Sequence, residues 1–331
     1  MLNLSLKLNS KIFDQNIITE SMREGFGQGL VIAGEKNKNV MALCADLTDS
    51  LKMNLFKNRF PKRFIEVGIA EQNLATVASG LASCGKIPFI GSFAVFSPGR
   101  NWEQIRTSIC YNNVPVKIVG SHAGLNVGPD GATHQALEDI ALMRVLPNMI
   151  VEVPCDYFEA IKATTLIAEN KKPSYLRLER DPSVAITSLL SPFEIGVAYA
   201  LWIGDVPDVL IIGCGSGLYE ALLAAKELKK EQIEVVVLNN HTIKPMDEKT
   251  ILQWVKKCIG VVTIEDHQIY GGMGSAVAEL LAQKCPKKIK MLGVNDSFGE
   301  SGTKQELYTK HHLTSQDIIL AVRDIVRWKK K

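Results

Sequence analysis

The sequence predicts an α/β protein of two domains with mostly parallel strands and flanking helices. Short runs rich in valine, isoleucine and leucine alternate with longer segments of helical periodicity, a pattern typical of α/β folds. Prolines between Arg180 and Pro207 interrupt this alternation and indicate a linker. The length of 331 residues also exceeds what one ordinary core requires. We therefore expect a first domain at 12–185, a linker at 186–206 and a smaller second domain at 207–331.

The first domain is expected to open with a helix, from about Thr19 to Glu35, because apolar positions recur there at helical spacing and Thr19 can serve as its N-cap. Short apolar runs between turn residues then predict buried strands. The predicted strands are 39–43, 64–67, 87–92, 116–120, 149–153 and 174–178, and the predicted helices between them are 71–83, 102–111, 134–143 and 156–168.

The second domain repeats the same rhythm without repeating the sequence. Its apolar runs again have the length of buried strands, and its longer periodic segments have the length of helices. The predicted strands are 208–212, 234–238, 260–265 and 289–293, and the predicted helices are 218–229, 247–257, 272–284 and 314–327.

Composition argues against several classes of protein. A net charge of +3 is too small to indicate a nucleic-acid-binding surface. No apolar run approaches the roughly 20 residues that span a bilayer, and the N-terminus lacks the features of a signal peptide. The seven cysteines are scattered and form no Cys-x-x-Cys pair, so we expect buried, reduced thiols in a cytoplasmic protein rather than disulfides or a zinc site.

The segment Gly128–Gln135 carries the strongest local signal for a site. Its Gly-Pro-Asp-Gly turn cannot remain helical, because Pro129 lacks an N–H and the glycines admit positive φ. The turn is expected to deliver Asp130 and His134 to the start of the next helix. A carboxylate and an imidazole in such a loop suit the recognition of hydroxyl and phosphate groups.

Other polar and aromatic residues follow predicted strands of the first domain. Alone, a polar residue at a strand end is commonly structural, and an aromatic pair is commonly part of the core. Together they indicate a site, since open α/β sheets bind ligands outside the carboxyl ends of their strands. The aromatic pair suits the wall of a planar ring. The residues are Asp46, His122, Arg180, Phe93 and Phe96.

Three further segments permit a structural explanation. Glu71 begins a helix, where a carboxylate favours the helix dipole, but the small residues that follow also allow close approach of a cofactor or another chain. Gly213–Gly217 lacks the full spacing of a dinucleotide-binding loop and is better explained as a strand-to-helix turn. The segment 265–274, Glu-Asp-His followed by glycines, is a similar turn that could also touch a partner subunit.

These motifs resemble those of the transketolase family. Residues 19–180 resemble its pyrimidine-binding domain and residues 207–327 its C-terminal domain. The resemblance rests on Gly-x-Asp-Gly-x-Thr-His-Gln at 128–135, Val-Gly-Ile-Ala-Glu-Gln-Asn at 67–73 and Ser-Phe-Ala-Val-Phe at 92–96. The combination is most similar to the short C-terminal subunit of split, two-chain transketolases.

The resemblance implies a cofactor and a partner. Transketolases use thiamine diphosphate, whose diphosphate and divalent metal are held by a domain with a Gly-Asp-Gly motif that this sequence lacks. It implies a separate N-terminal, diphosphate-binding subunit that holds Mg²⁺ or Ca²⁺, an α2β2 assembly, and no metal ligand in this chain.

The resemblance also implies roles for individual residues. Glu71 is expected to bind the aminopyrimidine ring and activate the cofactor, which performs the difficult chemistry itself. Phe93 and Phe96 would stack on that ring, and Asp46 would organise the cofactor site across the subunit interface. The expected sugar-binding residues are Asp130 and His134 at the hydroxyls, with His134 also catalytic, and Arg23, Ser50, His122 and Arg180 at the phosphate.

Ketol transfer from a ketose phosphate to an aldose is the activity that the resemblance implies. A subunit similar to deoxyxylulose-phosphate synthase or to the β chain of 2-oxo-acid dehydrogenases, acting on pyruvate or another 2-oxo acid, is an alternative. A non-catalytic regulatory partner of the same fold is another. Pro129 and the segment Ser97–Gly99 depart from the common family pattern near the substrate, which leaves the identity of the sugar open between the usual pentose phosphate and another sugar.

Overall fold

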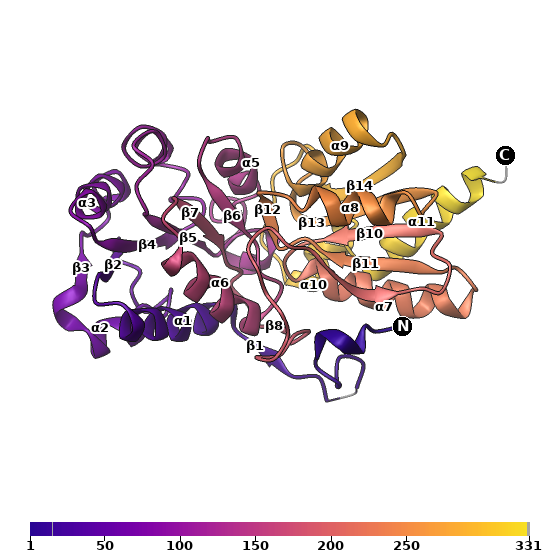
Figure 1. Cartoon of the computed structure of the whole chain (residues 1–331), viewed down its shortest axis with the longest axis horizontal. Coiled ribbons are helices and arrows are strands. Elements are labelled where there is room, and N and C mark those ends of the chain that lie inside the picture. Colours follow the sequence, from indigo (N-terminus) through magenta and orange to yellow (C-terminus); the bar gives the residue numbers. More distant parts are fainter. Residues whose placement is uncertain (15, 330–331) are drawn as a thin grey trace.

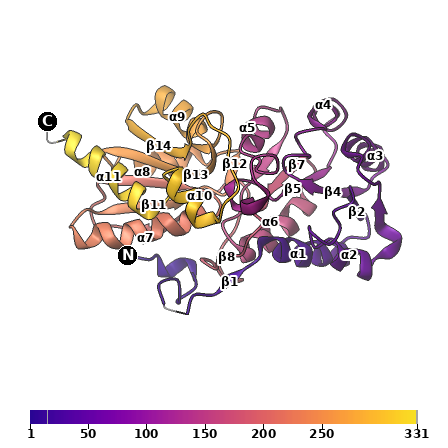
Figure 2. The same ribbon diagram turned by 180° about the vertical axis from the view of Figure 1, so that it is seen from behind.

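The computed structural model describes residues 1–14 and 16–329. It confirms the α/β fold and shows two large sheets side by side, each covered by helices on both faces (Figure 1). The first half of the chain surrounds one sheet and most of the second half surrounds the other, as the view from behind also shows (Figure 2).

The first sheet has seven strands in the order β12-β6-β7-β5-β4-β2-β3. All are parallel except β12, which joins the edge antiparallel to β6 and comes from the second half of the chain. The strands are β2 (Val40–Cys44), β3 (Phe64–Glu66), β4 (Ile87–Phe93), β5 (Lys117–Ser121), β6 (Ile150–Glu152), β7 (Ser174–Arg177) and β12 (Thr242–Lys244).

Two layers of helices enclose this sheet. Gly25 lets two helices of one layer approach closely, because a Cβ there would lie 2.4 Å from the carbonyl oxygen of Tyr157. One layer comprises α1 (Met22–Lys36), α2 (Asn54–Arg59) and α6 (Tyr157–Glu169), and the other comprises α3 (Glu71–Ser83), α4 (Trp102–Gln104), the π-helix η3 (Ile105–Tyr111) and α5 (Asp139–Arg144). Short 3-10 turns are η1 (Leu4–Leu6), η2 (Pro61–Arg63) and η4 (Leu125–Asp130).

Two predicted helix starts are wrong. Thr19 does not cap a helix: Thr19–Glu20 form strand β1, which pairs with β8 (Ser183–Val184), and α1 starts at Met22. The helix expected at 134–143 starts at Asp139, because the carbonyl of Ala136 accepts a hydrogen bond from the Gly124 N–H at 2.8 Å and draws that segment away from helical geometry. Both errors arise from pairing with segments distant in sequence.

The second sheet has five strands in the order β14-β13-β10-β11-β9. Only β9 is antiparallel, and it lies inside the segment 186–206 that we expected to be a linker. The strands are β9 (Tyr199–Ile203), β10 (Val209–Gly213), β11 (Val235–Asn239), β13 (Gly260–Gln268) and β14 (Lys288–Val294), and the helices are α7 (Gly217–Lys230), α8 (Glu248–Val255), α9 (Met273–Lys284), α10 (Lys304–Lys310) and α11 (Ser315–Lys329).

The two halves share a continuous apolar core. One buried cluster includes Leu74 of α3, Ile118 of β5, Leu210 of β10 and Val277 of α9. The N-terminal segment also packs on the second sheet, since the N–H of Asn3 donates to the carbonyl oxygen of Leu201 at 2.8 Å (Figure 1). We retain 12–185 and 207–331 as proposed domain boundaries, with β9 added to the second domain.

Thiols and helix lengths complete the description. All seven cysteines are free; five are buried as expected, whereas Cys84 is exposed and Cys285 is half-buried. No helix within the described ranges combines the length and apolar character needed to cross a bilayer.

Candidate active site

The candidate site lies where neighbouring strands of the first sheet end. Strands β7, β5, β4 and β2 are adjacent and parallel, so their carboxyl ends share one edge. Phe93 is the last residue of β4, His122 directly follows β5, and Asp46 and Arg180 lie a few residues beyond β2 and β7. The sheet topology therefore brings these sequence-distant residues to one edge.

Glu71 is the first residue of α3 and only 4% exposed. The N-terminus of a helix favours a carboxylate. A guanidinium nitrogen (Nη1) of Arg100 lies 3.4 Å from its Oε2, and the side-chain amide of Asn101 donates to its backbone carbonyl at 3.0 Å. Residues 69–73 and Arg100 line a cavity of about 520 Å³ beside it. Arg100 and Asn101 escaped the sequence analysis because only the fold brings them to Glu71.

Four rings form a cluster next to this cavity. Phe93 and Phe96 are stacked with centroids 6.1 Å apart, and Phe93 also stacks on His122 at 3.8 Å. His134 presents its edge to both phenylalanines, at 6.3 and 5.6 Å. The Arg100 guanidinium lies over the Phe96 ring at 4.4 Å, so Arg100 connects the aromatic cluster to Glu71.

Two arginines, Arg23 and Arg180, lie beside the cluster and are held by backbone carbonyl oxygens. Arg23 donates to the carbonyl oxygens of Arg180 (3.0 Å) and Ser50 (2.7 Å). Arg180 donates to the carbonyl oxygen of Val127 at 2.7 Å. Within the described part of the chain neither guanidinium forms an ion pair. Adjacent guanidinium groups held by neutral carbonyls are suited to bind an anion.

His122 is buried close to these positive charges. Burial, followed by the charges of Arg23, Arg180 and His134, lowers the pKa of His122 to about 3. His122 is therefore neutral at physiological pH and can offer only a neutral hydrogen bond. Its Nδ1 lies 2.9 Å from the Ser121 hydroxyl, which orients the ring.

The predicted residues Asp130 and Asp46 lie more openly. Asp130 ends the turn η4 and is exposed, and His134 follows it with Nδ1 3.0 Å from the Thr133 hydroxyl. Asp46 is also exposed, and among the described residues no hydrogen bond joins either carboxylate to the ring cluster. The structure thus gathers Glu71, the rings and the arginines, and leaves these two carboxylates at the rim.

Glu66 organises the loops near Glu71, and the sequence analysis missed it. Its carboxylate accepts the backbone N–H of Asp46 at 2.8 Å, the hydroxyl of Thr48 at 2.9 Å and the N–H of Gly68 at 3.2 Å. Glu66 therefore fixes Asp46, which has a φ of 59°, relative to the start of α3. No local sequence motif predicts the contacts of Glu66 with Asp46 and Thr48, because these residues are about 20 positions apart.

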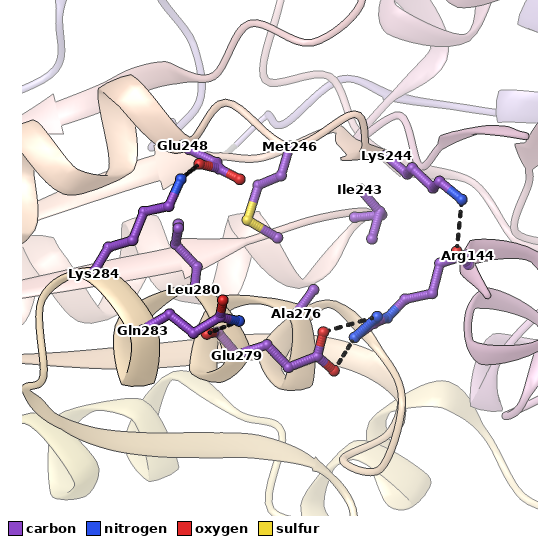
Figure 3. Close-up of a pocket in the computed structure, with 10 residues that line it drawn as sticks. All are labelled: Arg144, Ile243, Lys244, Met246, Glu248, Ala276, Glu279, Leu280, Gln283 and Lys284. Atoms are coloured by element: carbon purple, nitrogen blue, oxygen red, sulfur yellow. Dashed lines mark hydrogen bonds and ion pairs between the residues drawn. The ribbon is translucent and has the colours of Figure 1, made fainter. Parts of the chain in front are cut away.

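A second cavity of about 300 Å³ lies between Arg144 and the helices α8 and α9 (Figure 3). Its charged groups satisfy one another: Arg144 pairs with Glu279 at 2.5 Å, and Lys284 pairs with Glu248. The Lys244 ammonium donates to the carbonyl oxygen of Arg144 at 3.0 Å. This cavity therefore offers less unsatisfied charge than the edge of the first sheet.

In the described ranges, no group of three or more histidine, cysteine, aspartate or glutamate side chains is arranged to hold a metal ion.

Comparison with known proteins identifies the family. Residues 19–183 match the pyrimidine-binding domain of transketolase and residues 198–318 match the transketolase C-terminal domain. A putative transketolase C-terminal section from Methanocaldococcus jannaschii is 43% identical over 304 residues, covering 91% of this chain and 95% of that protein. The 6-deoxy-6-sulfo-D-fructose transketolase subunit of Clostridium sp. (strain MSTE9) is 38% identical over 317 residues, covering 96% and 98%.

A solved structure described as a split-gene transketolase, an inactive β4 tetramer, superposes with a TM-score of 0.87 at 44% identity and covers 93% of this chain and 98% of that one. The chain spans about half of other relatives, such as 49% of human transketolase and 47% of the 1-deoxy-D-xylulose-5-phosphate synthase of Desulfotalea psychrophila, each 36% identical. The chain therefore belongs to the transketolase family, as a counterpart of the C-terminal subunit of split transketolases.

Proposed function

We propose that this chain is the pyrimidine-binding subunit of a thiamine-diphosphate-dependent transketolase. The complete enzyme would move a two-carbon ketol unit from a ketose phosphate to an aldose acceptor. The observation that carries the proposal is a pair of arginines, Arg23 and Arg180, which form no ion pair with any described residue. They lie beside the cluster of Phe93, Phe96, His122 and His134. An anion site next to stacked rings suits a phosphorylated sugar beside a planar cofactor.

The residues around Glu71 suit the pyrimidine half of thiamine diphosphate. The buried Glu71 carboxylate adjoins a cavity, and the buried Oδ1 of Asn101 has no partner among the described residues. Glu71 would hold a ring nitrogen, while Phe93 and Phe96 wall the ring. When bound, the cofactor supplies a nucleophilic carbon that carries the two-carbon unit. Binding of the cofactor would require Glu71 to give up its contact with Arg100 and to bind the pyrimidine ring instead.

The sugar would lie between the arginines and the turn η4. Arg23 and Arg180 present planar donors to an anionic end group, and neutral His122 adds a hydrogen bond without further charge. Ser50 contributes its backbone carbonyl to hold Arg23, and we propose that its hydroxyl joins the same anion. Asp130 and His134 would bind the hydroxyls near the reacting bond, and Asp46 would contribute at the subunit interface.

A separate subunit would supply the diphosphate and metal sites. We propose an N-terminal partner that holds Mg²⁺ or Ca²⁺, in a complex of two chains of each kind. Support comes from relatives that cover nearly this whole chain and are named as a C-terminal section and a subunit. The related structure described as an inactive β4 tetramer is consistent with a need for a second kind of chain.

A sulfonated sugar is a second candidate substrate. The Clostridium relative is named for 6-deoxy-6-sulfo-D-fructose and is 38% identical. A sulfonate is tetrahedral and anionic like a phosphate, so the same two guanidinium groups suit it. The alternative of a pyruvate-using enzyme also persists, since 1-deoxy-D-xylulose-5-phosphate synthases are among the relatives.

A donor competition assay tests the proposal. The complex captured on this chain from its own cell would receive Mg²⁺, thiamine diphosphate and ribose 5-phosphate, with xylulose 5-phosphate, 6-deoxy-6-sulfofructose or pyruvate as the donor, and products would be identified by mass. We expect a seven-carbon ketose phosphate from one of the two sugars. Consumption of pyruvate without ketose exchange would overturn the proposal in favour of the 2-oxo-acid alternative.

A further inference from the structure

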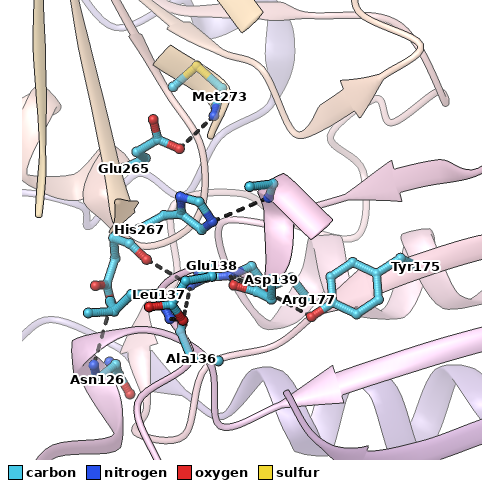
Figure 4. Close-up of polar contacts among 12 residues, drawn as sticks. Asn126, Ala136, Leu137, Glu138, Asp139, Tyr175, Arg177, Glu265, His267 and Met273 are labelled. Carbon is cyan, nitrogen blue, oxygen red and sulfur yellow. Dashed lines mark hydrogen bonds and ion pairs between the residues drawn. The ribbon is translucent and has the colours of Figure 1, made fainter. Parts of the chain in front are cut away.

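The motif Glu265-Asp266-His267 lies near the carboxyl end of strand β13, and all three side chains are buried. Glu265 accepts the backbone N–H groups of Met273 (2.6 Å) and Gly274 (2.7 Å), and so caps α9 of its own domain. His267 lies against the first domain, where its Nε2 is 3.4 Å from the N–H of Ala141 (Figure 4). Glu265 thus contacts its own domain, whereas His267, two residues later, contacts the first domain.

Asp266 binds the turn that leads to the sugar site. Its Oδ1 accepts the Leu125 N–H at 2.9 Å, and its Oδ2 lies 3.4 Å from the Asn126 nitrogen. Gly124 permits this approach, because a Cβ there would lie 2.2 Å from Oδ2, and its φ of 77° also favours glycine. Burial raises the pKa of Asp266 to about 6, which leaves the carboxylate ionised, and therefore an acceptor, at neutral pH.

The turn is also fixed by the two residues that flank Arg180 of the proposed anion site and by Arg180 itself. The Asn126 side chain donates to Glu179 at 3.0 Å and accepts the N–H of Asp181 at 2.6 Å. The following carbonyl, of Val127, accepts from Arg180. Three successive residues of η4 therefore join a carboxylate of the second domain to an arginine of the proposed sugar site.

A buried ion pair holds the backbone of Asp266 in place. Arg177 of β7 donates to the Asp266 carbonyl oxygen at 2.7 Å and to Asp139 at 2.9 Å. Asp139 also accepts the hydroxyl of Tyr175 at 2.7 Å (Figure 4). Because these groups are buried and paired, the position of Asp266 relative to the first sheet is closely determined.

We propose that Asp266 is a positioning residue through which the second domain sets the orientation of η4, and hence of Asp130 and Arg180 at the sugar site. The inference rests on the proposed function for its kinetic consequence only. Asp266 itself would not touch the substrate, and it would leave the pyrimidine site at Glu71 unaffected.

Glu265 provides a matched control, since it is an adjacent buried carboxylate that also accepts two backbone N–H groups, but from α9. In the captured complex, Asp266→Asn should lower kcat/KM for the sugar by about 10- to 100-fold, the effect of a small misplacement of binding groups. The affinity for thiamine diphosphate should stay within about twofold. Glu265→Gln should leave both constants close to wild type.

Hydrogen exchange tests the contact without any activity. The amides of Leu125 and Asn126 should exchange faster in Asp266→Asn and stay protected in Glu265→Gln. Gly124→Ala adds a Cβ that would displace the Asp266 carboxylate from the loop. This variant should therefore show the same faster exchange at Leu125 and Asn126, and it replaces Asp266→Asn if the latter folds poorly. The inference would be overturned if the amides of residues 125–126 exchanged as in the wild type in a folded Asp266→Asn or Gly124→Ala chain. It would also be overturned if Asp266→Asn and Glu265→Gln lowered kcat/KM for the sugar equally. An inactive wild-type complex would instead contradict the proposed function.

Discussion

The carboxyl edges of the two sheets hold similar residues but use them differently. At the edge of the first sheet, Arg23 and Arg180 donate only to carbonyl oxygens among residues 1–14 and 16–329. At the edge of the second sheet, polar groups are paired with the first domain: Asn239 donates to Glu159 at 2.7 Å, and Asp266 accepts from Leu125 at 2.9 Å.

The difference shows what a polar residue at a strand end can mean. Parallel sheets offer their carboxyl edges to ligands, but in the second sheet the first domain occupies that place. Burial of paired groups there fixes the relation of the domains, whereas unpaired cations at the first edge remain available to an external anion. The type of residue therefore does not decide its role. A polar side chain that is paired with another part of the chain is structural, and one without such a pair is suited to bind a ligand.

The largest effect is expected at Glu71, in the first region. Glu71→Gln keeps the size of the side chain but removes the ionisable group, so activity of the assembled complex should fall by about 10²- to 10⁴-fold. Size-exclusion chromatography should show unchanged assembly. The exposed Glu103→Gln serves as the control and should keep full activity. Wild-type activity in Glu71→Gln would refute the role of this carboxylate.

The buried ion pair of the first domain that supports the backbone of Asp266 should respond in stability. Arg177→Met leaves Asp139 buried without its cation, which typically costs about 3–5 kcal/mol in the free energy of unfolding. Urea denaturation would measure it. Arg323→Met breaks a solvent-accessible pair with Glu231 and should destabilise the chain much less, because exposed ion pairs contribute little. Equal effects of the two substitutions would contradict the structural importance of the buried pair.

Arg180 should affect substrate binding more than turnover. Arg180→Ala is expected to raise the sugar KM by about 10- to 100-fold, as for the loss of a hydrogen bond to a charged group, with a smaller change in kcat. Steady-state kinetics with the sugar found active would measure both constants. Arg59, an exposed arginine paired with Glu35, gives the control Arg59→Ala. An unchanged KM in Arg180→Ala would argue against an anion site.

The smallest effect is a pH dependence at His122. Its folded pKa of about 3 lies below the value of about 6.5 expected when unfolded. Its contribution to stability is therefore complete above pH 6.5 and is lost as pH falls, by about 2 kcal/mol at pH 5. Asparagine tolerates the φ of 54° at this position. Between pH 7 and 5, the free energy of unfolding of His122→Asn should fall by about 2 kcal/mol less than that of the wild type.

Urea denaturation at the two pH values measures this difference. His312→Asn, at an exposed position with a φ of 58°, is the control for replacing a histidine by asparagine at positive φ. If His122→Asn lost as much stability between pH 7 and 5 as the wild type, the surroundings of His122 would not hold this histidine neutral.

Much of the fold was predictable because its signals are local. Continuous apolar runs identified the buried strands, and the predicted helix at 71–83 coincides with α3. Strand β12, only three residues long, has no measurable periodicity and joins a sheet built mostly from the first half of the chain. The start of α1 depended on the pairing of β1 with β8, which no local pattern reveals.

The site divides in the same way. Motifs singled out Glu71, Phe93, Phe96, Asp130 and His134 because short segments carry them. Arg100 and Glu66 were missed, since their contacts join segments that only the folded sheet brings together. The role proposed for Asp266 likewise depends on a contact between residues 141 positions apart.

The central claim is that this chain supplies half of an active site that another chain completes. The most direct test is to measure ketol transfer by the purified chain with Mg²⁺ and thiamine diphosphate, before and after adding the partner fraction captured from its own cell. We predict no transfer by the chain alone and restored transfer with the partner fraction, at a fixed ratio of the two chains. Equal rates of transfer with and without that fraction would contradict the account.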